Sequence, residues 1–356
     1  MANTKLETVL TQWQNLQPLA EIDRDRLSRR FTIDFNYNSN HIEGNTLTYG
    51  QTELLLLFGK IVGEANFRDC EEMKASNVGL QMMLVESSDK QLPLTQNFIR
   101  TLHRTLLRED YTVYRMLPGG VQTSYVIHAG QYKTRPNSVI TRYGDRFEYA
   151  SPEETPALMA DLVDWYNHAE QEGKLSPIDL AILFHYRYIR IHPFEDGNGR
   201  IARLMVNYIL SRHGYPMIVV RSRLKQDYLE ALHRADLIVG STPADGAHAS
   251  LKDIRPFHKY MVNLICHELE NDVLFVTEKS QDVWWYDGER IAFRTPSYGK
   301  ILQELRREPK ATLAYLQEEI GINRSALQKL LQTLLDKHYV ERDADGSWRV
   351  FITPSM

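Results

Sequence analysis

The chain has 356 residues, of which 46 are acidic and 42 are basic, so its net charge at neutral pH is −4. Hydrophobic residues make up 43% and charged residues 25%, and these ordinary globular proportions exclude disordered, collagen-like and coiled-coil proteins. The length predicts two or three domains. The small net charge argues against a protein whose main role is to coat nucleic acid.

Cysteine content and hydropathy indicate the kind of cellular compartment in which the protein is expected. Cys70 and Cys266 are too few for a disulfide framework and lack the CxxC spacing of a zinc site, so we expect two core or half-buried thiols. The N-terminus lacks the basic and apolar regions of a signal peptide. The most apolar stretch, residues 54–62, is shorter than the roughly 18 residues that a membrane-spanning helix needs. We therefore expect a soluble, cytoplasmic protein with no membrane partner.

Apolar residues recur every three or four positions along most of the chain, which predicts a mainly helical fold. The clearest helices are expected at 6–16, 98–106, 158–166, 176–188, 201–212 and from about 255 to 270. Strand signals are scarce before residue 280, and the best one is Ser138–Tyr149, where two β-branched or aromatic runs flank Tyr-Gly-Asp. A hairpin alone in a helical domain is only marginally stable, so we expect it to have a function.

The chain changes character near residue 290. Residues 290–356 hold eleven basic and eight acidic residues, which leaves a charge of −7 for the rest. Three short amphipathic helices are predicted at 298–306, 313–320 and 324–336, followed by β-rich runs at 339–342 and 348–352. This order is typical of a winged helix-turn-helix, in which Gly321 lies in the turn and Asn323 or Ser325 caps the third helix.

The most informative segment is 192–203, with the sequence H-P-F-E-D-G-N-G-R-I-A-R. The Gly-Asn-Gly turn at 197–199 precedes an apolar helix, and the free backbone amides at such a helix N-terminus suit a phosphate group. Arg200 and Arg203 lie three residues apart on that helix and add donors for phosphate oxygens. The segment therefore predicts an anion-binding site.

Two further side chains in this segment add chemistry. Asp196 precedes the glycine turn, and a carboxylate beside bound phosphates is a usual ligand of Mg²⁺. His192 is the one group in the segment that can take up a proton near neutral pH. Together with the anion site, they predict phosphoryl or nucleotidyl transfer.

This string matches every defined position of HxFx[D/E]GNGRxxR, the signature of the Fic (filamentation induced by cAMP) family, which the chain resembles. The resemblance covers roughly residues 95–270 and includes AGQYKT at 129–134, the hairpin, and DYLEALHRAD at 227–236. It implies a mainly α fold, a Fic-type helical bundle with a β-hairpin flap. It also implies transfer of AMP from ATP to a Ser, Thr or Tyr hydroxyl of a protein, with release of pyrophosphate.

The resemblance implies a role for each matching residue. His192 is expected to be the general base, and Asp196 a ligand of Mg²⁺, the expected cofactor with ATP as co-substrate. The residues expected to bind the nucleotide are Gly197, Asn198, Gly199, Arg200, Arg203, Tyr228 and Asp236. Many relatives have Asn at the position of Asp236. The flap residues Val139, Ile140 and Thr141 are expected to pair with the target peptide as an added strand.

An inhibitory element is implied upstream, where residues 39–44, S-N-H-I-E-G, fit the family pattern [S/T]xxxE[G/N]. The pattern alone is loose, since a Ser four residues before Glu-Gly is common on surface helices. Beside the full motif it implies that Glu43, with Ser39, reaches Arg203 and removes a donor for the γ-phosphate. ATP then binds with its phosphates out of line for attack. The resemblance also allows removal of AMP, and the sequence does not decide the direction.

These observations predict four segments. They are an N-terminal helical arm with the inhibitory helix at 1–94, a Fic catalytic core at 95–270, a linker at 271–290 and a winged helix-turn-helix domain at 291–356. The protein partners expected are a hydroxyl-bearing target, the chain itself as a substrate, and a second copy in a homodimer.

Three functions remain open at this point. The first is an autoinhibited protein adenylyltransferase, which the intact His192 and Asp196 favour. The second is a transcriptional regulator with a nucleotide-sensing Fic core, in which Arg324, Gln328 and Lys329 of the winged helix contact DNA. The third is a kinase-like or other nucleotidyl-transferring variant, because the anion loop suits several phosphates.

Overall fold

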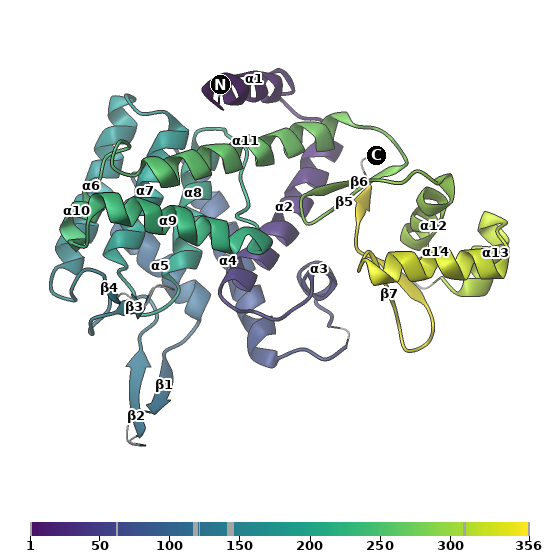
Figure 1. Cartoon of the computed structure of the whole chain (residues 1–356), viewed down its shortest axis with the longest axis horizontal. Coiled ribbons are helices and arrows are strands. Elements are labelled where there is room, and N and C mark those ends of the chain that lie inside the picture. The colour runs from purple at the N-terminus through teal and green to yellow at the C-terminus, as the bar shows by residue number, and fades with distance from the viewer. Residues whose placement is uncertain are drawn as a thin grey trace.

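The computed structural model of the chain describes residues 2–61, 63–116, 120, 122–140, 146–308 and 311–354. They form a helical body with a smaller C-terminal module beside it, and a two-stranded hairpin projects from the body (Figure 1). The mainly α fold predicted from the apolar periodicity is confirmed.

The body contains most of the helices. They are α1 (Ala2–Asn15), α2 (Glu21–Ile42), α3 (Tyr49–Phe58), α4 (Phe67–Ser88), α5 (Gln96–Leu107), α6 (Thr155–Glu172), α7 (Pro177–Ile191), α8 (Asn198–Arg212), α9 (Lys225–Val239), α10 (Pro243–Ala247) and α11 (Arg255–Thr277), with a 3₁₀ turn, η1, at Ser222–Leu224. Each predicted helix is present, although α8 begins earlier and α11 ends later than the sequence indicated.

The helices α7 and α8 form the centre of the body because apolar residues surround both of them. Ser176 caps α7 by accepting a hydrogen bond from the Asp179 amide, and Pro177 occupies the first turn, where no amide is needed. Buried residues of α1, α2 and α4 belong to the same hydrophobic core. The arm expected at 1–94 therefore packs as part of the helical body, and α2, the helix expected to be inhibitory, belongs to its core.

Two antiparallel hairpins interrupt the helices. The predicted one is confirmed as β3 (Ser138–Ile140) paired with β4 (Arg146–Glu148), whereas its turn, including Thr141, lies outside the described residues. The longer hairpin, β1 (Tyr111–Met116) with β2 (Gln122–Ile127), was not predicted. Its strands are rich in Thr, Val and Tyr, and Pro-Gly-Gly stands between them in the sequence, so the signal was present.

The C-terminal module contains α12 (Pro296–Arg307), α13 (Leu313–Ile320), α14 (Arg324–Asp336), β5 (Val283–Tyr286), β6 (Glu289–Ala292), β7 (Val340–Arg342), β8 (Trp348–Val350) and β9 (Thr353–Pro354). As predicted, Gly321 turns the chain with a φ of 71°, and Asn323 caps α14 by accepting from the Ala326 amide. Three helices followed by the β7–β8 hairpin confirm the predicted winged helix.

Residues 271–290 are ordered structure rather than the expected linker. α11 continues to Thr277, and β5 pairs with both β6 and β9. Trp284 of β5 is fully buried in the core of the module, which therefore begins near residue 283. The domain boundary predicted from the sequence was placed at the change of charge near residue 290. That prediction missed Asp287-Gly288, a pair of residues typical of a hairpin turn, between the two strands.

Two sequence expectations concern cysteines and membranes. Cys70 and Cys266 are both buried free thiols, as predicted. Within the part of the chain that the structure describes, no helix has the length and apolarity to cross a membrane.

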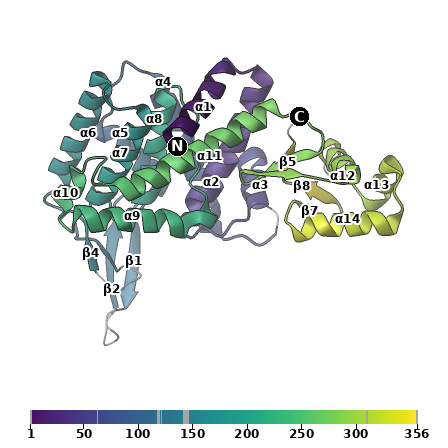
Figure 2. The ribbon, with the colours of Figure 1, turned by 45° about the horizontal axis from the view of Figure 1, so that its top comes forward.

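Arg221, a buried residue just before η1, joins three parts of the chain. Its guanidinium lies 2.8 Å from Asp34 of α2, 2.6 Å from Glu268 of α11 and 3.1 Å from Asp287 in the β5–β6 turn. The turn approaches so closely that a Cβ on Gly288, which has a φ of 73°, would collide with the guanidinium. α2 thus lies on the side of the helical body that faces the winged-helix module, as the tilted view also shows (Figure 2).

Replacing Arg221 by Met should strongly destabilise the protein, because three carboxylates would lose their shared cation at a buried position. Breaking a buried pair from one side costs about 3–5 kcal/mol. Urea unfolding followed by circular dichroism measures the effect. Arg24→Met, which alters an exposed pair with Asp25, is the control and should shift the midpoint little. Equal midpoints for the two variants would contradict the role of Arg221.

Candidate active site

The segment 192–203 forms the loop between α7 and α8 and the first turns of α8. His192 ends α7 in a left-handed conformation with a φ of 51°, and its ring stacks on Tyr149 with centroids 3.9 Å apart. Gly197, with a φ of 76°, immediately precedes α8. His192, Asp196 and the amides that begin α8 therefore belong to one short loop.

Lys133 holds this loop from one side, and the sequence did not single it out. Its Nζ donates to the carbonyl oxygens of Ile191 and His192 at 3.1 and 2.9 Å. Loss of hydration lowers the pKa of Lys133 to about 8. Its place in the string AGQYKT was the only available signal.

His103 holds the loop from the other side and was also missed. Its Nδ1 accepts from the Gly130 amide at 2.8 Å, so its Nε2 donates to the carbonyl oxygen of Asp196 at 3.0 Å. The ring stacks on Phe194 with centroids 3.7 Å apart. Burial lowers the pKa of His103 to about 4, so the ring stays neutral. No motif in the sequence marks this residue.

His192 is uncharged at neutral pH. Burial, and then the nearby Lys133 charge, lower the pKa of its imidazole to about 3. Contact with the Ile189 backbone and the charge of Asp196 raise this pKa but do not outweigh burial. A neutral imidazole can accept a proton from a hydroxyl, and negative phosphate groups beside it would raise its basicity.

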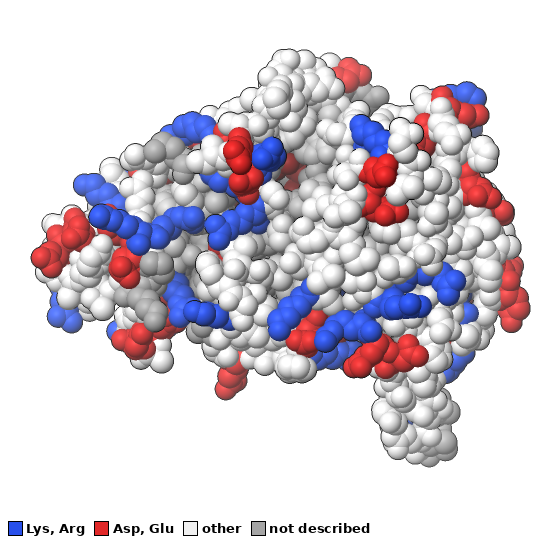
Figure 3. All heavy atoms as spheres, turned by 180° about the vertical axis from the view of Figure 1, so that it is seen from behind, with Lys and Arg blue, Asp and Glu red and all other residues white. Residues whose placement is uncertain are grey.

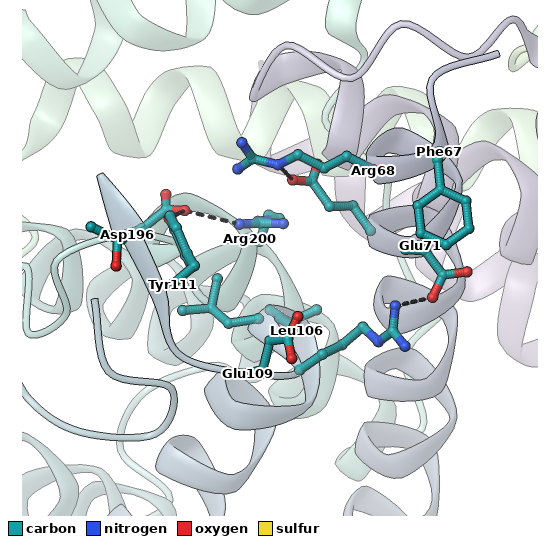
Figure 4. A pocket seen from close by; sticks show the side chains of 12 residues that line it. Phe67, Arg68, Glu71, Leu106, Glu109, Tyr111, Asp196 and Arg200 are labelled. Carbon is teal, nitrogen blue, oxygen red and sulfur yellow. Dashed lines mark hydrogen bonds and ion pairs between the residues drawn. The ribbon is translucent and has the colours of Figure 1, made fainter. Parts of the chain in front are cut away.

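Asp196 faces a pocket of about 410 Å³ that opens beside the loop (Figure 4). Its Oδ1 accepts from the Gly197 amide at 2.6 Å and its Oδ2 from the Tyr111 hydroxyl at 2.7 Å, with Arg200 at 3.5 Å. Burial raises the pKa of Asp196, but Arg200, Tyr111 and the Gly197 amide outweigh it and keep the pKa below its usual value. The group is therefore a carboxylate.

Arg200 lines the same pocket and can donate hydrogen bonds to an anion there. Its side chain is buried, and its Nε has no hydrogen-bond partner within the described parts of the chain. Asn198, in contrast, uses its side chain within the loop, where it bonds both the amide and the carbonyl oxygen of Phe194. Tyr111, on β1, is a further contact of Asp196 that no sequence signal indicated.

Arg203 lies on α8 and binds the C-terminal end of α2. Its Nε donates to Ser39 Oγ at 3.0 Å, and its Nη2 donates to the Ser39 carbonyl oxygen at 2.8 Å and to Glu43 Oε1 at 2.7 Å. A Cβ at position 199 would lie 2.5 Å from Glu43 Oε1, so Gly199 leaves the space that the carboxylate occupies. The pairing of Glu43 and Ser39 with Arg203 is present as expected.

Tyr228 and Asp236, on α9, lie near this loop. The Tyr228 hydroxyl is buried and lies 2.8 Å from His185 Nε2. Asp236 accepts from the Tyr186 hydroxyl at 2.8 Å and pairs with Arg190 at 3.3 Å. Their expected contacts with adenine and ribose stay predictions.

The backbones of Val139 and Ile140 pair with β4, opposite Phe147 and Arg146. Their expected pairing with a target peptide also stays a prediction.

Comparison with known proteins identifies the family. The profile of the Fic/DOC family matches residues 93–210. The crystal structure of a Fic-domain-containing signaling protein from Bacteroides thetaiotaomicron VPI-5482 is 53% identical, with a TM-score of 0.71, and the match covers 76% of this chain and 96% of that chain. The chain belongs to the Fic/DOC family. Residues 299–341 also match a winged helix-turn-helix DNA-binding family.

More distant relatives of this Fic protein carry named activities. Protein adenylyltransferase fic-1 of Caenorhabditis elegans is 29% identical over 237 residues, which are 66% of this chain and 40% of that protein. The structure of C. elegans Fic-1 residues 134–508 aligns with a TM-score of 0.59 at 25% identity, covering 76% of this chain and 72% of that one. The chain thus spans about 40% of the length of the curated relative.

The protonation state of His192 can be measured directly. Because burial and Lys133 hold its pKa near 3, its imidazole should remain neutral from pH 8 down to pH 5. ¹⁵N spectra of histidine-labelled protein should show one pair of ring resonances that does not move over this range and is missing from His192→Ala. A titration of this pair with a midpoint near 6.5, the ordinary value for histidine, would contradict the prediction.

Proposed function

We propose that this Fic protein is an autoinhibited protein adenylyltransferase that transfers AMP from ATP to a Ser, Thr or Tyr hydroxyl of a protein. The observation that carries the proposal is the single guanidinium of Arg203, which lies beside the motif loop and is bound by Ser39 and Glu43 of α2. The naming of the C. elegans relative as a protein adenylyltransferase supports the reaction class.

In the proposed reaction, the neutral His192 accepts the proton of the target hydroxyl. The hydroxyl oxygen then forms a bond to the α-phosphorus of ATP, the bond from that phosphorus to the bridging oxygen breaks, and pyrophosphate leaves. Arg200 and the amides at the start of α8 stabilise the developing negative charge. Lys133 and His103 keep the loop in position, so both are positioning residues.

The site fits a Mg²⁺ ion, and Asp196 would hold it. Mg²⁺ is usually bound by one or two carboxylates together with substrate phosphates and water. Asp196 supplies one carboxylate that is 40% exposed. No group of three acidic, His or Cys side chains placed for a metal occurs among the described residues, so the phosphates must complete the shell. The ion would neutralise phosphate charge.

Glu43 accounts for the inhibition in this proposal. Its carboxylate occupies an Arg203 donor that the γ-phosphate needs, and its Oε1 lies over Gly199 at the start of α8. ATP is then held with its phosphates out of line, and misplacement of about 1 Å can cost roughly a hundredfold in rate. The same carboxylate beside the loop also suits activation of water, so removal of AMP is the reverse activity to test.

Glu43→Gly should increase incorporation of labelled AMP from ATP by about a hundredfold, because Arg203 becomes free to align the phosphates. Auto-modification, detected as an AMP-sized mass increase, provides the readout. The double variant Glu43→Gly with His192→Ala should be inactive, because it lacks the base. If Glu43→Gly labels no faster than the parent, the inhibitory role is wrong. Labelling that survives in the double variant would overturn the role of His192.

A second candidate function is regulation of transcription, favoured by the match of residues 299–341 to a DNA-binding winged helix. Arg324, Gln328 and Lys329 are exposed on α14, where contacts to phosphates and base edges are possible. In this function the Fic core acts as the sensor of the nucleotide.

DNA binding can be separated from catalysis by a pair of variants. If the winged helix reads DNA, the double variant Arg324→Ala with Lys329→Ala should lose affinity for duplex DNA by about tenfold or more and give a weaker salt dependence. Fluorescence anisotropy at several salt concentrations measures both. His192→Ala should bind DNA normally. Absence of a salt-dependent signal from the parent protein would rule out this function.

A further inference from the structure

A cavity of about 360 Å³ lies where α2 and α3 meet the winged-helix module. Five arginines line it, Arg26, Arg29 and Arg30 of α2, Arg306 of α12 and Arg349 of β8. On the face seen in Figure 3, basic side chains form a row over the module and the adjoining part of the body. The cavity is separate from the Asp196 pocket, and no lining residue is shared.

Three of these arginines already form ion pairs with carboxylates. Arg30 pairs with Asp272, and Arg349 pairs with Asp343 at 2.7 Å. Arg26 pairs with Asp23 at 3.1 Å and also donates to the Pro354 carbonyl oxygen at 2.6 Å.

Arg29 and Arg306 carry the uncompensated charge. Neither forms an ion pair with any carboxylate that the structure describes, and both reach solvent at the rim of the cavity. Loss of hydration lowers the pKa of Arg306; Glu53 raises it, and the charges of Arg29 and Arg26 lower it further. Arg29 and Arg26 therefore each lie close enough to Arg306 to repel its guanidinium, and an anion bound beside Arg29 and Arg306 would relieve this repulsion.

Glu53 of α3 is the acidic residue in the lining, and it compensates this charge poorly. Its Oε2 is buried without a hydrogen-bond partner in the described parts of the chain. Burial raises the pKa of Glu53 to about 7, against the lowering influence of Arg306 and Arg29. Apart from Thr353, the rest of the wall is apolar and includes Leu54 and Phe58. A ligand here needs an anionic group and an apolar portion.

We propose that this cavity binds a small phosphorylated molecule, with its phosphate held by Arg29 and Arg306 and its apolar part against Leu54 and Phe58. Forked guanidinium donors match phosphate oxygens in pairs, which makes arginine the usual residue for this contact. The bound molecule bridges α2, whose C-terminal end contacts Arg203, to α12 of the winged helix. The binding does not depend on the proposed enzymatic activity.

The test titrates the full-length protein with phenyl phosphate by calorimetry, with phenol as the uncharged control. Saturable binding of phenyl phosphate is expected, and phenol should not bind. Arg29→Ala and Arg306→Ala should each weaken binding about tenfold or more, as expected for loss of a charge-assisted hydrogen bond. Glu53→Gln should strengthen binding several-fold, because it removes the opposing carboxylate. Both arginines are exposed, so these variants should fold.

Two controls make the result decisive. Arg307→Ala alters the next arginine along α12, which does not line the cavity and should bind like the parent. Arg200→Ala removes an arginine of the motif loop and should also leave this binding intact. The proposal is wrong if the parent does not bind, if Arg29→Ala and Arg306→Ala bind normally, if Arg307→Ala weakens binding equally, or if Arg200→Ala abolishes it.

Discussion

The arrangement of the site depends on how the buried guanidinium of Arg203 is neutralised. A charged group that is only 3% exposed needs a partner, and an unpaired one would cost several kcal/mol. In this structure the partners come from α2, far away in sequence, through Ser39 and Glu43. The charge of Arg203 therefore fixes the C-terminal end of α2. In the proposed function, the phosphates of ATP would need the same donor, so the two contacts would exclude each other.

The same helix also connects the body to the winged-helix module. Asp34, nine residues before Glu43, binds Arg221, and Arg221 in turn holds Asp287 of the β5–β6 turn. Nearer its N-terminus, α2 supplies Arg26 and Arg29 to the arginine-lined cavity. Three separate interactions thus act on one helix, which joins the contacts at the module side to the Arg203 contact on α8.

Much of the fold and the motif could be predicted because the signals are local. Periodic apolar residues predict the central helices α7 and α8 and most of the others, although α3, α4, α9 and α10 were not among the helices expected. The contiguous motif predicts that His192 and Asp196 share one loop. His103, Lys133 and Tyr111 could not be found in this way, since they reach the loop from distant segments and act through backbone carbonyls or a single hydroxyl. The β1–β2 hairpin and β5 were missed for another reason. Residues typical of turns stand between the strands in both cases. The helical pattern around the first hairpin and the change of charge near residue 290 nevertheless decided the prediction.

The position of Glu43 on the same chain as Arg203 makes their contact independent of protein concentration. The tethered carboxylate meets the guanidinium at a local concentration that the fold sets, and dilution does not change it. Under the proposed autoinhibition, each molecule would be held inactive alone, whether the cell makes few copies or many. A movement of Glu43 away from Arg203, rather than a larger supply of protein, would free that donor.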